Sequence, residues 1–411
     1  MSTITSIKQN WYKKVQNDIE LQNMINSHSF SFLLKIGEGS FIWTVENKSI
    51  FYEDTVTIDN VWDFTINIPE EAWNNFLAPV APAFHNTLQA MIAKVEGVTI
   101  DGNRLRWAQS INIIERILYL ARESNPHPVN GESGYDPQSI NGHYVSMGVN
   151  GEDYVTYYEE AGQGQPVIFL HTAGSDSRQY KHLLGNKELQ KKWHMFAFDL
   201  PYHGKSEPPQ GWWKKPYRLT TELYTEWIFN FMKATNLFDK KPIISGSSMG
   251  GAIVLYLADK YGDLFKGVIS LEGGFGSAGR KVKWTNHPQV HAGQFLSSWV
   301  AGLMSPESPE NYRRLVLWEY SQGGPGVYQG DTYFYSHDFP DLSKHIGKAK
   351  CPLWILCGEY DYSCTPEMSE EAAKRMNGTF VKMERMGHFP MSENPIGFLE
   401  YFKPILEEAS K

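Results

Sequence analysis

The residues best suited to chemistry form the motif GSSMG at positions 246–250, which another glycine follows. The motif comes directly after an apolar, strand-like run at residues 242–245 and precedes the helical run AIVLYLADKYG. A serine in a sharp strand-to-helix turn needs small residues two positions on either side, because the neighbouring backbone approaches closely and the serine takes strained dihedral angles. The spacing therefore predicts Ser248, not Ser247, as a nucleophile, and the start of the next helix favours a developing anion.

A second motif, HTAGS at residues 171–175, also follows a strand-like run. Together with the GSSMG motif it resembles the alpha/beta hydrolase family over about residues 142–411, in which a His-Gly-x-Gly turn holds this place. The resemblance implies an oxyanion hole made by the N–H groups of Ala173 and Met249, with Thr172 as the second choice for the first donor. Thr172 also stands where the family usually has glycine. Each such donor is worth roughly 2.7–4 kcal/mol in the transition state.

The nucleophile requires two partners further along the chain. A serine hydroxyl is weakly nucleophilic at neutral pH, so it needs a general base, and the base needs an orienting carboxylate. The segments GEYD at 358–361 and MGHFP at 386–390 resemble the family's acid turn and its Gly-His turn. The resemblance implies Asp361 as acid and His388 as base, in the chain order Ser, Asp, His. Glu272, which ends an earlier strand-like run, is the alternative acid, since some family members supply the carboxylate there.

Other polar residues are expected to be structural. The segment DLPYHGKS at residues 199–206 resembles a strand-end turn of the same family, so His203 is expected to pack within that turn, and His171 under the oxyanion turn. No cluster of His, Asp or Glu has metal-ligand spacing, and no glycine-rich phosphate or dinucleotide loop occurs. The chemistry is therefore expected to need neither a metal nor another cofactor.

The motifs stand at the ends of apolar runs that alternate with helical patterns, which is typical of an α/β fold with a mostly parallel sheet and helices on both faces. The expected strands cover residues 154–159, 167–171, 195–199, 242–245, 268–272, 353–357 and 379–383. Residues of about 276–350 break the rhythm and are expected to form a helical cap rich in aromatic side chains. Trp284 and Trp318 in the cap, and Arg178 near the oxyanion turn, are the candidate substrate-binding residues.

A separate N-terminal α+β domain is expected over residues 1–125, joined by a Pro- and Gly-rich linker at 126–142 to the hydrolase-like domain at 143–411. Residues of roughly 30–122 weakly resemble the sterol-carrier-protein type of lipid-binding domain. A packing or dimerisation role is the alternative that we favour over a lipid pocket, so a homodimer is one expectation for the assembly.

The composition limits the classes of partner that the protein is expected to bind. The formal net charge of −8 gives no attraction for nucleic acid or an anionic membrane surface. Three cysteines lie within one short segment and are odd in number, which neither a disulfide framework nor zinc-ligand spacing would produce. The start of the chain lacks the apolar core of a signal peptide, and no run is long enough to span a bilayer. We therefore expect a soluble, cytoplasmic protein with a small-molecule partner.

These residues predict acyl transfer to water. The first expectation is a carboxylic-ester or lactone hydrolase for a sizeable apolar or aromatic substrate. The alternative is a carbon–carbon bond hydrolase acting on a vinylogous diketone, since similar Gly-x-Ser-Met-Gly-Gly elbows serve such enzymes. A binding protein with a degenerate hydrolase domain is a third hypothesis. It is disfavoured because a binding module needs none of the four catalytic parts.

Overall fold

The computed structural model describes residues 2–122, 134–276 and 283–411, so residues 126–133 of the expected linker and 277–282 of the expected cap lie outside the described residues. The chain divides into two compact units. Unit 1 comprises Met1–His127 and His287–Gly302, and unit 2 comprises Pro128–Asn286 and Leu303–Lys411. Within the described ranges, no helix has both the length and the apolar character that crossing a membrane would require.

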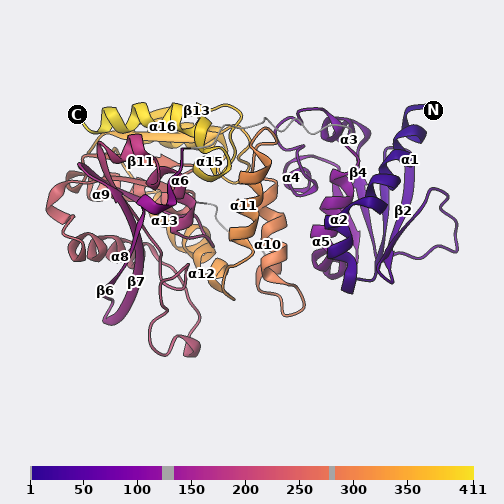
Figure 1. The fold of residues 1–411 in the computed structure, drawn as a ribbon, viewed down its shortest axis with the longest axis horizontal. Helices are drawn as coiled ribbons and strands as arrows, with labels where there is room; N and C mark the ends of the chain where they lie inside the picture. Colours follow the sequence, from indigo (N-terminus) through magenta and orange to yellow (C-terminus); the bar gives the residue numbers. More distant parts are fainter. Residues whose placement is uncertain (1, 123–133, 277–282) are drawn as a thin grey trace. The chain divides into compact units, whose positions relative to one another are not determined.

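Unit 1 is an α+β unit built on a five-stranded sheet in the order β3-β2-β1-β4-β5 (Figure 1). Strands β1 and β2 form an antiparallel hairpin, and β1 pairs in parallel with β4. Alternate side chains of β4 are buried, whereas β1 also buries Leu33 between Phe32 and Leu34. The strands are β1 (Phe30–Ile36), β2 (Gly39–Glu46), β3 (Ser49–Glu53), β4 (Phe64–Ile68) and β5 (Thr99–Gly102), and the helices are α1 (Ser2–Asn17), α2 (Ile19–Met24), α3 (Glu70–Leu77), α4 (Leu88–Lys94) and α5 (Arg104–Tyr119).

One helix of the expected cap belongs to unit 1 instead. Helix α10 (Ala292–Ala301) packs on α5, where the rings of Trp107 and Phe295 meet edge to face at 6.2 Å. The Asn86 side chain donates a hydrogen bond to the backbone oxygen of Gly302 at 2.9 Å. The expected boundaries therefore differ from the structure, because the apolar face of α10 is buried against the N-terminal unit.

Unit 2 contains an eight-stranded sheet in the order β13-β12-β11-β10-β8-β9-β7-β6, parallel except for the antiparallel pairings of β7 with β6 and β9. Every residue of β10, β11 and β12 is buried, which explains their continuous apolar sequences. The strands are β6 (Asn141–Val149), β7 (Glu152–Gly162), β8 (Gln165–Leu170), β9 (Trp193–Phe198), β10 (Ile243–Ser247), β11 (Gly267–Leu271), β12 (Leu353–Gly358) and β13 (Thr379–Met383).

Helices cover both faces of this sheet and form two apolar layers (Figure 1). One layer is contributed by α8 (Thr221–Ala234), α9 (Met249–Lys260) and α14 (Pro366–Met376). The opposite layer is contributed by α6 (Lys181–Leu184), α7 (Lys187–Gln190), α15 (Pro390–Glu393) and α16 (Pro395–Ala409). The part of the insertion that stays in unit 2 holds α11 (Glu310–Tyr320), α12 (Val327–Tyr333), a π-helical turn (Phe334–Asp338) and α13 (Phe339–Ser343).

Candidate active site

Ser248 lies in the tight turn between β10 and α9, with φ 55° and ψ −109°. This backbone conformation is costly for a residue with a Cβ, and it persists because the surrounding packing fixes it. The two flanking positions require glycine because a side chain there would clash with the neighbouring backbone. A Cβ on Gly246 would lie 2.2 Å from the Gly250 oxygen, and a Cβ on Gly250 would lie 2.6 Å from the Leu170 oxygen. The structure thus gives the physical reason for the GSSMG spacing.

The expected acid and base follow two other strands of the same sheet. Asp361 comes after β12 and His388 after β13, and parallel strands bring their carboxyl ends, including that of β10 before Ser248, to one edge. His388 Nδ1 lies 2.6 Å from Asp361 Oδ2. The other oxygen of Asp361 accepts backbone N–H groups of Ser363 at 2.7 Å and Cys364 at 3.1 Å. Asp361 is fully buried and held by hydrogen bonds on both oxygens.

The second ring nitrogen of His388 is available for proton transfer. Because Nδ1 faces a carboxylate, it carries the proton, and the neutral ring presents a lone pair at Nε2. Among the described residues, neither this Nε2 nor Ser248 Oγ forms a hydrogen bond. Catalytic hydrogen bonds of this kind are often formed only when substrate binds. The geometry therefore orients the ring of His388, the expected base, and leaves its Nε2 without a competing partner among the described residues.

Glu272, the alternative acid, lies beside Asp361 but is not the carboxylate bonded to His388. Both its oxygens accept the Gly358 N–H at 3.0 Å. Donor atoms of Glu272, Asp361 and Cys357 lie within 4.8 Å of one another, which is close enough for a metal ion. However, burial and then the charge of Asp361 raise the pKa of Glu272 well above its usual value, and burial likewise raises the pKa of the Cys357 thiol. Glu272 and Asp361 therefore fit a carboxyl pair that shares a proton.

The turn after β8 holds the expected oxyanion donors. Thr172 N–H donates to Gln179 Oε1 at 2.9 Å, and Gly174 N–H donates to Asp331 Oδ2 at 2.8 Å. The N–H of Ala173, between them, has no acceptor among the described residues. Met249 N–H belongs to the first turn of α9, where backbone donors lack helical partners. Ala173 and Met249 thus have available donors, whereas the N–H of Thr172 is already occupied.

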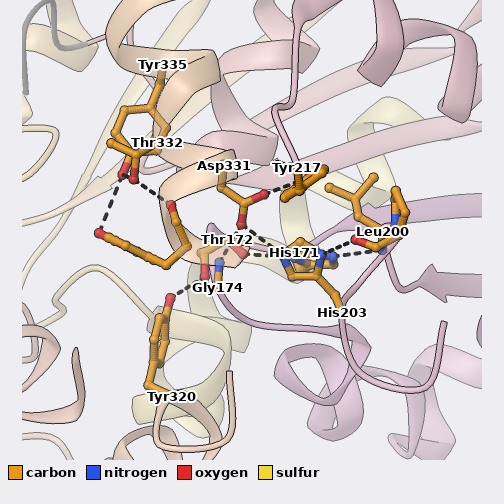
Figure 2. Close-up of polar contacts among 12 residues, drawn as sticks. His171, Thr172, Gly174, Leu200, His203, Tyr217, Tyr320, Asp331, Thr332 and Tyr335 are labelled. Carbon is orange, nitrogen blue, oxygen red and sulfur yellow. Dashed lines mark hydrogen bonds and ion pairs between the residues drawn. The ribbon is translucent and has the colours of Figure 1, made fainter. Parts of the chain in front are cut away.

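A buried network fastens this turn to the insertion, as Figure 2 shows. Asp331 of α12 accepts a hydrogen bond from His203 Nε2 at 2.8 Å and one from the Tyr217 hydroxyl at 2.8 Å. His203 Nδ1 faces the Pro201 oxygen at 2.8 Å, so both ring nitrogens donate and the ring is positively charged. Burial opposes that charge, but Asp331 outweighs it and raises the pKa of His203.

His171 is the neutral neighbour of this charged histidine. Its Nε2 accepts the Leu200 N–H at 3.1 Å, and its Nδ1 donates to the Thr172 oxygen at 2.8 Å (Figure 2). Burial, followed by the charge of His203, lowers the pKa of His171 to about 4. Both histidines stabilise turns beside the site, as we expected from the segments that contain them.

The three candidate substrate-binding residues lie outside the lining of the small pocket beside Ser248. Arg178 is committed to Asp176 through hydrogen bonds of 2.8 and 2.6 Å, and it lies 5.4 Å from the ring centre of the half-exposed Trp318. The Lys283 ammonium lies 4.6 Å from the ring centre of Trp284. Within the described part of the chain, none of the three lines the pocket beside Ser248.

That pocket has a volume of about 30 Å³, and its lining includes Ser248, Met249 and Glu272, which the sequence predicted for the site, together with residues that it did not predict. Its apolar walls include Met249, Ala252, Tyr335 and Met368. Tyr335 is in the expected aromatic cap, but nothing in the sequence distinguishes it from the other cap aromatics. The space suits a small acyl group, so a larger substrate must place most of its bulk outside this pocket.

Glu393 is a second residue without a sequence signal. It lies in α15 and accepts backbone N–H groups from Gly387, next to His388, and from Ser305 at 3.0 Å. Burial raises the pKa of Glu393 to about 8. The backbone of His388 is also held, because its N–H donates to the Leu303 oxygen at 2.9 Å. The turn that carries the base is therefore fixed on both sides.

Comparison with known proteins places this geometry among hydrolases. A model described as the alpha/beta hydrolase family matches residues 167–400. A 2-hydroxy-6-oxo-6-(2'-aminophenyl)hexa-2,4-dienoic acid hydrolase of Metapseudomonas resinovorans is 31% identical over 283 residues, which are 62% of this chain and 88% of that protein.

Two solved structures show the same fold. A thermophilic esterase from Thermogutta terrifontis superposes with a TM-score of 0.52 at 21% identity, covering 66% of this chain and 100% of the esterase. An enol-lactonase from Burkholderia xenovorans gives a TM-score of 0.53 at 17% identity, covering 64% of this chain and 99% of the lactonase. The α/β architecture expected from the sequence is thereby confirmed.

Proposed function

This chain belongs to the alpha/beta hydrolase family, and we propose that it is a serine hydrolase that cleaves a carboxylic ester or lactone through an acyl-enzyme. One observation carries the proposal. His388 Nδ1 is bound to the buried Asp361 at 2.6 Å, which leaves Nε2 to act at the sheet edge where Ser248 is exposed to a pocket. The expected absence of a cofactor stays part of the proposal, since each step below uses only side chains and water.

The proposed reaction begins when His388 Nε2 removes the proton of Ser248 and Oγ forms a bond to the substrate carbonyl carbon. The carbonyl oxygen becomes an anion that the N–H groups of Ala173 and Met249 stabilise. As the bond to the leaving oxygen breaks, His388 returns its proton to that oxygen. Water then loses a proton to His388 and attacks the acyl carbon, and Ser248 leaves with the proton, which releases the carboxylic acid.

A second candidate is hydrolysis of a carbon–carbon bond in a vinylogous diketone by the same three residues. The 31% identity to the dienoic acid hydrolase favours it. Arg178, our candidate for holding a substrate carboxylate, is instead paired with Asp176, so this reaction would need another cation. The ester reaction requires no such group, and we keep it as the first proposal.

The test is hydrolysis of a p-nitrophenyl ester chain-length series and of a vinylogous diketone by wild type, Ser248→Ala and Ser247→Ala. The Ser247 hydroxyl is buried without a hydrogen-bond partner among the described residues, so its loss is a matched control. We expect ester turnover to fall by roughly 10⁴–10⁶-fold in Ser248→Ala and to persist in Ser247→Ala. Diketone cleavage without ester turnover would favour the second candidate.

Covalent labelling provides an independent check. A fluorophosphonate should modify wild type and Ser247→Ala but not Ser248→Ala, because the reagent bonds to an activated serine oxygen. Equal labelling of Ser248→Ala, or no labelling of wild type, would contradict the proposed nucleophile.

A further inference from the structure

A second cavity in unit 2, of about 1190 Å³, is lined by two groups of residues and does not include Ser248. One group follows β9 and covers residues 212–218 together with Tyr202. The other comes from the insertion and includes residues 325–327 and Tyr333. The cavity is as large as those that enclose drug-sized ligands. Its size would admit such a ligand, and its lining indicates which chemical class of ligand would fit.

The charged groups of this cavity are cations. Lys214, Lys215, Arg218 and Lys283 line it, and among its described lining residues there is no Asp or Glu. Only Lys215 is neutralised, through an ion pair with Glu152. Lys214, Arg218 and Lys283 have no ion-pair partner within the described ranges. In a chain whose net charge is −8, such a one-signed group indicates attraction for an anion.

The remaining walls are largely aromatic. Trp212 and Trp213 are 47% and 67% exposed, which leaves their ring faces accessible. The Arg218 guanidinium lies 5.3 Å from the ring centre of Tyr333, and the His337 ring stacks on the same tyrosine at 5.4 Å. A guanidinium held on an aromatic ring keeps its in-plane donors for a carboxylate. Exposed indole rings next to it suit a flat apolar body.

We propose that this cavity binds an organic anion with a flat aromatic body, of the aryl carboxylate class. The Arg218 guanidinium and the Lys214 ammonium hold the carboxylate, and Trp213 packs against the ring. The site goes beyond the proposed hydrolytic function, since its lining contains none of Ser248, Asp361 or His388. It also differs from the pocket beside Ser248, whose described lining has no cation.

The experiment is isothermal titration of the full-length protein with sodium 2-naphthoate and with 2-naphthamide, its neutral analogue of the same shape. We expect one naphthoate per chain and about tenfold weaker binding of the amide, because the amide lacks the charge that strengthens hydrogen bonds to Arg218 and Lys214. A tenfold change corresponds to about 1.4 kcal/mol. Arg218→Gln should weaken naphthoate binding by about tenfold and leave amide binding unchanged. Raising the salt concentration should weaken only the naphthoate.

Two further variants serve as controls for the location of the bound anion. Lys382→Gln, on the edge strand β13, removes an exposed cation outside the cavity and should change nothing. Ser248→Ala should bind naphthoate as wild type does. Equal affinity for acid and amide, no binding, or unchanged affinity in an Arg218→Gln/Lys214→Gln double variant with a wild-type melting temperature would overturn the proposal. Loss of binding in Ser248→Ala would place the anion in the catalytic pocket and overturn it as well.

Discussion

Among its described residues, unit 2 contains two buried histidine–aspartate pairs. In one, His388 lies 2.6 Å from Asp361, and in the other, His203 lies 2.8 Å from Asp331. All four side chains are at most 5% exposed. By residue type, distance and burial the two pairs are alike, yet we assign catalysis to the first and a structural role to the second.

The difference lies in the second ring nitrogen. His203 Nδ1 faces the Pro201 oxygen, so both of its nitrogens donate and neither can take a proton. His388 Nε2 has no partner among the described residues and can accept one. A histidine in a buried histidine–carboxylate pair can therefore act as a base only when its ring nitrogen remote from the carboxylate has no hydrogen-bond partner. Otherwise the two residues form a fixed ion pair.

Replacing each histidine in turn should produce the largest difference in activity between the two pairs. His388→Gln should reduce kcat for an ester by about 10⁴-fold or more, because the general base is lost. His203→Gln should cost at most about 10²–10³-fold, the value of one misplaced oxyanion donor. Steady-state kinetics on one p-nitrophenyl ester would measure both. Equal losses would mean that His203 takes part in proton transfer.

Asp361 and Glu272, the two carboxyl groups near His388, should also differ in their effect on activity. Asp361→Asn should reduce kcat by roughly 10⁴-fold, since the amide favours the wrong ring tautomer of His388. Glu272→Gln should cost less than about tenfold, because a protonated carboxyl and an amide are both neutral and both accept the Gly358 N–H. Kinetics on the same ester distinguishes them. The reverse order would make Glu272 the orienting acid.

The structural pair should govern stability. Asp331→Asn leaves the His203 charge buried without a counter-ion, and we expect the free energy of unfolding of unit 2 to fall by about 3–5 kcal/mol. Urea unfolding monitored by fluorescence would measure the change. Asp341→Asn, which removes an exposed partner of Lys344, is the control and should leave the transition in place. Unchanged stability in Asp331→Asn would mean that His203 is neutral.

The pH dependence of stability gives the smallest expected effect. His203 has a raised pKa, so its contribution is complete below the unfolded value of about 6.5 and is lost as pH rises through the folded value. His171 has a pKa lowered to about 4, so its contribution is lost as pH falls from about 6.5 to 4. The stability difference between wild type and His203→Gln should therefore be largest at pH 6 and shrink at pH 9. A difference that grows with pH would contradict the assigned charge.

Ser248, Asp361 and His388, the proposed nucleophile, acid and base, could be singled out from the sequence because they lie in motifs with local backbone constraints. Gly246 and Gly250 are required by contacts of 2.2 and 2.6 Å, so the motif reflects space within a single turn. The buried strands before these residues produced continuous apolar runs. Both signals lie within about ten residues of the site.

Asp331 had no comparable signal, because its role depends on contacts with distant segments. It bonds to Gly174, which is 157 residues away, and to His203, which is 128 residues away. The position of α10 could likewise not be predicted. Its apolar periodicity indicates that one face is buried, but it does not indicate which part of the chain covers that face. The second cavity combines the segment after β9 with the insertion, and its lining residues 212–218 and 325–327 belong to no motif.

The position of α10 also has a consequence for biosynthesis. Most of unit 1 precedes unit 2 in the chain and is translated before it, yet the core of unit 1 includes Phe295 of α10. The 175 residues between His127 and Gly302 take about 9–35 s to translate at roughly 5–20 residues per second. During that interval strands β6 to β11 emerge while the surface of α5 that receives α10 stays uncovered. The core of unit 1 can therefore be completed only after most strands of the unit 2 sheet have been made.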